Sequence, residues 1–77
     1  KKMKEKIREF LGRYFEERDV KDNDNIFELG LVNSLFAMQL VNFVEQEFDI
    51  TVENEDLDLD NFKDINSILS LVESKMN

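Results

Sequence analysis

Cysteine and histidine are both absent from this sequence of 77 residues. Without cysteine the chain forms no disulfide and no thiolate metal site, and without histidine it loses the usual general base near neutral pH and a preferred zinc ligand. A cysteine nucleophile is excluded as well. These absences argue against catalysis by the chain's own side chains, so we expect the protein not to be an enzyme.

Proline is also absent, and glycine occurs only twice. Apolar residues recur at helical rather than alternating spacing, which predicts an all-α fold. The length suffices for one compact core, so we expect a single domain over residues 1–77. The sequence begins with Lys1, and whether it is a free protein or a domain of a longer chain stays open at this point.

Positive charge is scarce, since the sequence has 10 basic and 18 acidic residues and therefore a formal net charge of −8. Such a field repels nucleic acid and anionic membranes and attracts basic protein surfaces. No apolar run approaches the roughly 20 residues that cross a bilayer, and the lysine-rich start lacks the apolar stretch of a signal peptide. We therefore expect a cytoplasmic monomer with protein partners, without binding to nucleic acid or membranes.

Three long helices and one short helix are predicted, and the first of them ends near Arg18. A loop follows over residues 19–33, where turn-forming residues surround apolar side chains that should hold the loop on the core. The predicted buried stripe of the first helix is Met3, Ile7, Phe10, Leu11 and Tyr14, and the loop anchors are Ile26, Phe27, Leu29 and Leu31.

The second predicted helix covers residues 34–48, with Asn33 or Ser34 as its N-cap. A short third helix is predicted around residues 54–60, and Asp64 should cap the last helix. The predicted buried stripe of the last helix is Ile65, Ile68, Leu69, Val72 and Met76. We interpret the aromatic set as core packing, namely Phe10, Tyr14, Phe15, Phe27, Phe43, Phe48 and Phe62.

The most informative stretch surrounds Ser34, at the predicted junction of loop and helix. It reads Phe27-Glu28-Leu29-Gly30-Leu31-Val32-Asn33-Ser34-Leu35. This resembles the signature of acyl and peptidyl carrier proteins, which reads Gly, any two residues, Asp, Ser and Leu. The serine of that signature is the modified residue. The resemblance extends over nearly the whole chain, including the end of the second helix at Phe48-Asp49, the acidic third segment and the entry into the last helix.

This resemblance implies a four-helix bundle of the acyl carrier protein type and a covalent 4′-phosphopantetheine arm on Ser34, with Asn33 as the supporting neighbour. The implied partners are a phosphopantetheinyl transferase and the enzymes that load and accept an acyl group. Physical chemistry agrees with such a site, because a phosphodiester on Ser34 would lie beside the free N–H groups at the positive end of the second helix. The thiol of the arm would supply the nucleophile that a cysteine-free chain lacks.

Asn33 departs from the family, which usually has Asp before the serine, where it is thought to help the transferase to position magnesium and coenzyme A. Asparagine is an equally good N-cap, so the departure bears on loading rather than on the fold. The string Val32-Asn33-Ser34-Leu35-Phe36-Ala37-Met38-Gln39-Leu40 resembles discrete carriers of malonyl-type extender units for polyketide synthases. That resemblance implies a malonyl-type cargo.

A rotation of about 100° per residue divides the second helix into two faces. One face gathers Leu35, Met38, Gln39, Asn42, Glu45 and Gln46, and the other gathers Ala37, Leu40, Val41, Val44 and Phe48. An exposed methionine among polar residues suits adaptable contact with a partner. In the family this helix is where enzymes dock, and the predicted partner residues are Leu35, Phe36, Met38, Gln39, Asn42 and Glu45. Phe36 lies at the edge of the buried face, so inward packing stays an alternative for it.

Two other interpretations compete with the carrier. Ser34 can act as a helix cap alone, in a helical adaptor domain that binds a partner through its second helix without being modified. The acidic residues Asp56, Asp58 and Asp60 have the alternating spacing of an EF-hand loop, but the expected glycine is Asn61 and the expected glutamate is Ser67. We therefore predict a solvated acidic face and no metal site.

Overall fold

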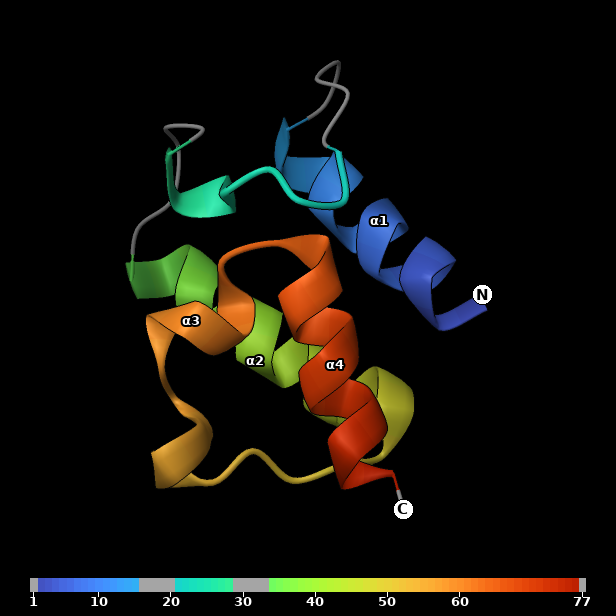
Figure 1. Cartoon of the computed structure of the whole chain (residues 1–77), viewed down its shortest axis with the longest axis vertical. Helices are drawn as coiled ribbons and strands as arrows, with labels where there is room; N and C mark the ends of the chain where they lie inside the picture. Colours follow the sequence, from blue (N-terminus) through green and yellow to red (C-terminus); the bar gives the residue numbers. More distant parts are fainter. Residues whose placement is uncertain (1, 16–20, 29–33, 77) are drawn as a thin grey trace.

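The computed structural model describes residues 2–15, 21–28 and 34–76. Within these ranges it contains four α-helices, two short 3-10 helices and no strand (Figure 1). The α-helices are α1 (Lys2–Phe15), α2 (Ser34–Phe48), α3 (Leu59–Phe62) and α4 (Ile65–Lys75), and the 3-10 helices are η1 (Ile26–Glu28) and η2 (Asn54–Asp56). The predicted all-α class with three long helices and one short helix is confirmed.

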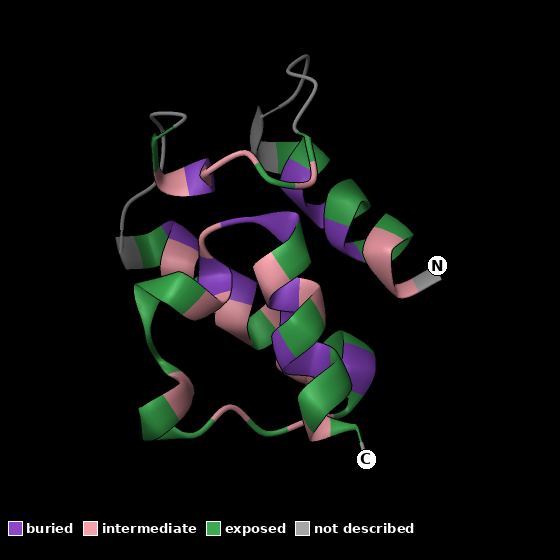
Figure 2. Cartoon of the chain, in the orientation of Figure 1, coloured by how far each residue is buried: buried purple, intermediate pink, exposed green. Residues whose placement is uncertain are grey.

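Helix α1 contributes one apolar stripe to the core and packs against α4. Ile7, Phe10 and Leu11 are buried as predicted, and Met3 is partly buried against them. The predicted end near Arg18 and the side chain of Tyr14 lie outside the described residues. The long core helices all turn their buried sides inward, as Figure 2 shows.

The segment before η1 is fastened to both α1 and the start of α4. Its Asp22 carboxylate pairs with Lys4, at 2.9 Å, and with Arg8, while its backbone C=O accepts the N–H of Asn66 at 3.1 Å. Ile26 is fully buried and its N–H donates to the C=O of Lys63 at 2.7 Å. The predicted anchoring of the loop is confirmed at Ile26 and at Phe27, which is partly buried against the core, whereas the predicted anchors Leu29 and Leu31 lie outside the described residues.

Helix α2 has the bounds that the sequence predicts, from residue 34 to residue 48. It ends where Asp49 adopts a left-handed conformation with φ of 56°. The N–H of Ile50 then donates to the C=O of Glu45 at 3.2 Å, which is the backbone bond of a Schellman ending. The backbone conformation of Asp49 therefore ends the helix, and the following residues return toward α2, where the N–H of Val52 meets the carboxylate of Glu45.

The predicted third helix over residues 54–60 is wrong in its bounds. The structure instead has η2, followed by Leu57 in an irregular conformation and then the four-residue α3, whose N-cap Asp58 accepts the N–H of Asp60 at 2.9 Å. One helix through this region would have needed an apolar stripe, but Leu57 and Leu59 are both mainly exposed. A capping box between Glu53 and Asp56 starts η2 instead, and the short helix ends at its C-cap Leu57.

Helix α4 begins as predicted, because the Asp64 side chain accepts the N–H of Ser67 at 2.7 Å. Its buried stripe differs from the prediction at three positions. Leu71 is buried and Leu69 only partly so, since Leu71 follows Ile68 by three residues and faces the core with Val72. Met76 was predicted to be buried, but it is exposed because it follows the last helical residue as the C-cap.

Aromatic rings from α1 and α2 pack together in the core. The rings of Phe10 and Phe43 stack with centroids 4.4 Å apart, and Phe43 meets Phe48 edge-on at 5.9 Å. Core packing is thus confirmed for Phe10, Phe48 and Phe62, which are buried, and for Phe27 and Phe43, which pack against the core while partly exposed. The side chains of Tyr14 and Phe15 lie outside the described part of the chain.

Candidate functional site

Ser34 is the first residue of α2, so it lies at the N-terminal end of this helix. The side chain of Ser34 and the whole of Asn33 lie outside the described residues. The helix is 15 residues long and its first turn contains no acidic residue. The first-turn N–H groups of such a helix have no acceptor within it and favour an anion, so the position fits a phosphodiester.

The face of α2 next to Ser34 is exposed and partly apolar. Leu35 is 63% exposed and Met38 is 68% exposed, and Gln39 and Asn42 are exposed as well. These four residues lie on one side of the helix, as the rotation by 100° per residue predicts. We call Leu35, Met38, Gln39 and Asn42 the outer face of α2.

Two of the predicted partner residues do not belong to this face. Phe36 is only 3% exposed, and its ring lies 6.3 Å from that of Phe10, so α1 covers it. Glu45 is partly buried, and its carboxylate accepts the backbone N–H of Val52 at 2.9 Å. Phe36 therefore has a core role, and Glu45 holds the segment after α2 in place.

A shallow groove of about 590 Å³ runs along the outer face of α2. Its floor is mainly apolar, and its far side is formed by Leu57, which comes from the segment between η2 and α3. The lining residues are Leu35, Ala37, Met38, Gln39, Val41, Asn42 and Leu57. Because apolar surface of this kind is costly to leave in water, the groove is a candidate contact surface.

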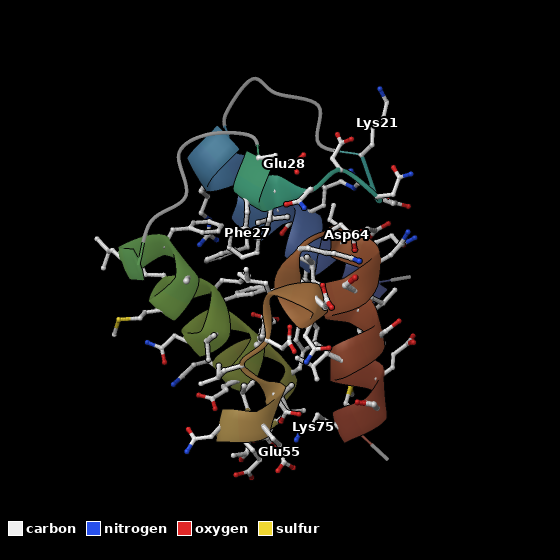
Figure 3. All side chains as sticks on the ribbon, turned by 60° about the vertical axis from the view of Figure 1, so that its left-hand side comes forward. Lys21, Phe27, Glu28, Glu55, Asp64 and Lys75 are labelled. Atoms are coloured by element: carbon white, nitrogen blue, oxygen red, sulfur yellow. The ribbon has the colours of Figure 1, made fainter. Side chains whose placement is uncertain are left out.

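A smaller cavity of about 200 Å³ lies on the other side of Leu57. It is lined by residues of η1, α2 and the segment leading through α3, and Phe27 reaches into this region from η1 (Figure 3). Its lining residues are Phe27, Ala37, Leu40, Val41, Leu57, Asp58, Leu59 and Phe62. Ala37, Val41 and Leu57 line both spaces, so these three side chains separate the groove from the cavity.

The sequence signal for Leu57 is its position in the acidic run of residues 53–60. Leu57 and Leu59 are the apolar residues that interrupt this run, in the region where the sequence predicts a third helix. The structure uses them instead as walls of the groove and the cavity. A single exposed leucine does not by itself mark a binding surface, so the place of Leu57 in the candidate site follows from its position in the lining of the groove and the cavity.

Negative charge surrounds this whole region. Residues 22–62 contain no Lys or Arg. The acidic residues in the same stretch are Asp22, Asp24, Glu28, Glu45, Glu47, Asp49, Glu53, Glu55, Asp56, Asp58 and Asp60. In the described ranges no three His, Cys, Asp or Glu side chains gather as a metal site. No helix there is long and apolar enough to cross a membrane.

Three of these carboxylates, those of Asp22, Glu47 and Asp56, pair with cations from α1 or α4. A hydrogen bond from Lys4 holds the pKa of Asp22 below its ordinary value of 3.8, and a hydrogen bond from Lys75 does the same for the pKa of Asp56. The charges around Asp22 are Lys4 and Arg8, and those around Asp56 are Lys75 with the neighbouring Glu53 and Glu55.

The ion pairs of Asp22 and Asp56 make the free energy of unfolding depend on pH in the acidic range. Because each folded-state pKa lies below the unfolded value of 3.8, the stability that these groups contribute is fully present about one pH unit or more above that value and is lost as the pH falls through the folded-state pKa. We expect the parent to melt at a higher temperature than the Asp22→Asn, Asp56→Asn double variant above about pH 5, with the gap closing below that value. Thermal melts from neutral to strongly acidic pH measure the gap. A gap that stays constant to the acid end would contradict the role of the two carboxylates.

A helical bundle that offers a serine at the start of a helix with an exposed apolar face has the layout of a carrier domain. The family described as "Phosphopantetheine attachment site" matches residues 1–73, and the chain belongs to this family. No curated protein and no solved structure gives a significant match. The family carries a 4′-phosphopantetheine prosthetic group, acts as a carrier without catalysing reactions, and interacts with phosphopantetheinyl transferases and biosynthetic enzymes.

Proposed function

We propose that residues 1–77 form one acyl carrier domain, in which Ser34 bears the phosphopantetheine arm and the arm presents an acyl group to a biosynthetic enzyme in the cytoplasm. The observation that supports this assignment most strongly is the position of Ser34. It is the first residue of α2 and stands in the Gly-containing motif within the stretch that matches the family.

Loading forms one bond and breaks another. The Ser34 hydroxyl oxygen attacks the pyrophosphate of coenzyme A, a P–O bond to serine forms, adenosine 3′,5′-bisphosphate leaves, and the hydroxyl proton passes to a base of the transferase. The N–H groups of the first turn of α2 and the lack of acidic residues there favour the resulting phosphodiester. Asn33, beside Ser34, supports the start of the helix as a cap. The bound arm supplies a thiol that holds the cargo as a thioester.

The cargo we propose is a malonyl-type extender unit for a polyketide synthase. The support is the resemblance of residues 32–40 to discrete carriers of such units. A malonyl-type group has a free carboxylate, and the small cavity is apolar with Asp58 in its wall. Burying that carboxylate beside another would be costly, so we expect the cargo to stay in solvent, accessible to the acceptor enzyme.

The outer face of α2, with Leu35, Met38, Gln39 and Asn42, is the surface we propose for docking. Its apolar centre is next to the attachment residue, and the acidic stretch from η2 to α3 lies across the groove. This arrangement fits an enzyme surface with an apolar centre and a basic rim, because the opposite charges steer the encounter and the apolar contact supplies affinity.

Intact-mass measurement tests the proposed function directly. After incubation with coenzyme A, magnesium and a broad-specificity transferase, we expect the parent to gain the mass of one phosphopantetheine. The Asn33→Asp variant is the matched control, because it restores the carboxylate that the family usually has before the serine. If neither protein gains the arm, the chain is an unmodified helical adaptor, which is the competing function.

Met38→Ala separates docking from folding. Because Met38 is exposed, we expect the free energy of unfolding to change by less than about 1 kcal/mol. Cargo transfer to an acceptor enzyme should weaken by about 1 kcal/mol or more, since an apolar anchor is lost from the centre of the docking surface. Denaturation curves and transfer kinetics measure the two effects.

Met76→Ala is the control, since Met76 is also an exposed methionine but follows the last residue of α4. This variant should leave transfer unchanged. A large loss of stability in Met38→Ala, with transfer unchanged after correction for the folded fraction, would show that Met38 supports the core and not docking.

A further inference from the structure

The segment from Ile50 to Asp58 packs on the core through Ile50 and Val52, and polar contacts attach it to α2 and to α4. The first contact is with Glu45 of α2, whose C=O accepts the N–H of Ile50 and whose carboxylate accepts the N–H of Val52. The second contact is an ion pair between Asp56 of η2 and Lys75, the last residue of α4. Figure 3 shows Lys75 close to η2, near Glu55. The middle of the acidic segment is thus held by a cation from the far end of the sequence.

The Lys75–Asp56 pair is more sheltered than the other ion pairs of the described residues. Its side chains are 23% and 15% exposed, whereas those of the Lys4–Asp22, Lys6–Glu47 and Arg8–Asp22 pairs are 35% to 50% exposed. Water screens a sheltered pair less, so this pair constrains geometry more than a surface pair does. Residues 22–77 contain only one other cation, Lys63.

Asp56 joins several parts of the segment. Its carboxylate also accepts the backbone N–H of Glu53 at 2.9 Å, and its C=O accepts the side-chain N–H of Asn61 at 2.9 Å. The first bond closes η2, and the second ties η2 to α3. Holding Asp56 therefore holds the chain on both sides of Leu57.

Leu57 is the residue whose position depends on this arrangement. Its N–H donates to the C=O of Asn54 at 3.1 Å, and its side chain is 55% exposed between the groove and the small cavity. Among the described residues outside α2, Leu57 alone lines both spaces. Without η2 in place, the groove would lose its far wall and the cavity would open toward it.

We propose that Lys75 is a positioning residue for the docking surface, because its ion pair with Asp56 holds η2 so that Leu57 stays against α2. The occupant of the completed groove is the acceptor enzyme, so this inference rests on the proposed function. It adds a residue of the last helix, remote from Ser34 in sequence, to the determinants of partner binding.

Lys75→Met tests the proposal, since it keeps the length of the side chain and removes the charge. We expect the backbone amides of residues 56–58 to exchange with solvent about tenfold faster than in the parent, while those in the middle of α2 keep their rates. With the loaded carrier as substrate, KM for the acceptor enzyme should rise about three- to tenfold and kcat should stay within about twofold.

Three further variants make the result specific. Asp56→Asn removes the charge from the other side and should act in the same direction. Lys75→Arg keeps the charge and should restore both the exchange rates and KM. Lys63→Met removes the other cation of residues 22–77 and should leave both readouts at the parent values.

Two results would overturn the inference. Unchanged exchange at residues 56–58 in Lys75→Met would show that the ion pair does not hold η2. Faster exchange with an unchanged KM would show that the position of Leu57 has no part in docking. If the parent fails to gain the arm, the proposed function fails, but the exchange measurement still decides whether Lys75 holds η2.

Discussion

Ser34→Ala is expected to abolish the gain of one phosphopantetheine when the protein is incubated with coenzyme A and a transferase. The substitution removes the only atom through which the arm is proposed to attach. The fold should survive, because the loss of a helix cap costs about 1 kcal/mol and α2 is held by buried residues along its length. Intact mass measures loading, and circular dichroism confirms that the helices remain.

Ser70→Ala is the matched control for this experiment. Ser70 is an exposed serine on α4, and it lies outside the motif around Ser34. This variant should load at the rate of the parent. If Ser34→Ala still gains the arm, another serine such as Ser67 or Ser70 bears it, and the interpretation of the motif is wrong.

Leu40→Ala should give the largest loss of stability, about 2–5 kcal/mol. Leu40 is almost completely buried and lines the small cavity together with Val41 and Phe62. The truncation would enlarge a space that already exists, and the surrounding helices would have to move to refill it. For a domain of this size, whose total stability is at the low end of about 5–15 kcal/mol, such a loss approaches the whole.

Chemical denaturation of parent and variant measures this loss. Asn42→Ala is the control on the same helix, because Asn42 is exposed on the outer face and its truncation should change stability by less than about 0.5 kcal/mol. If Leu40→Ala melts within a few degrees of the parent, α2 is rotated from its described orientation, and the docking surface would have to be reassigned.

The bounds of α2 could be predicted because they depend on nearby residues. A polar residue before the helix, continuous helical spacing of apolar residues and a break at Asp49 all lie in the sequence itself. The start of α4 at Asp64 was predictable for the same reason. The third helix was not, because the apolar spacing of Leu57 and Leu59 does not show whether their side chains reach a core.

In the candidate site, too, some features follow from local helix geometry and others from contacts with distant residues. Rotation along α2 predicts that Leu35 and Met38 point outward, since that angle follows from helix geometry alone. The angle of Phe36 falls at the edge of the buried face, and only the ring of Phe10 from α1 decides that it is covered. Glu45 looks like a surface residue of the helix until the returning chain brings the N–H of Val52 to its carboxylate.

The sequence by itself determined the helical class, the extent of α2, the cap of α4 and the family motif around Ser34. Each of these depends on residues within a few turns of one another or on residue types alone. Only the tertiary structure decided which leucines of the acidic segment form the groove and the cavity, and that Lys75 pairs with Asp56. Those contacts join residues far apart in the chain, and no local spacing records which distant side chains the packing of the helices brings together.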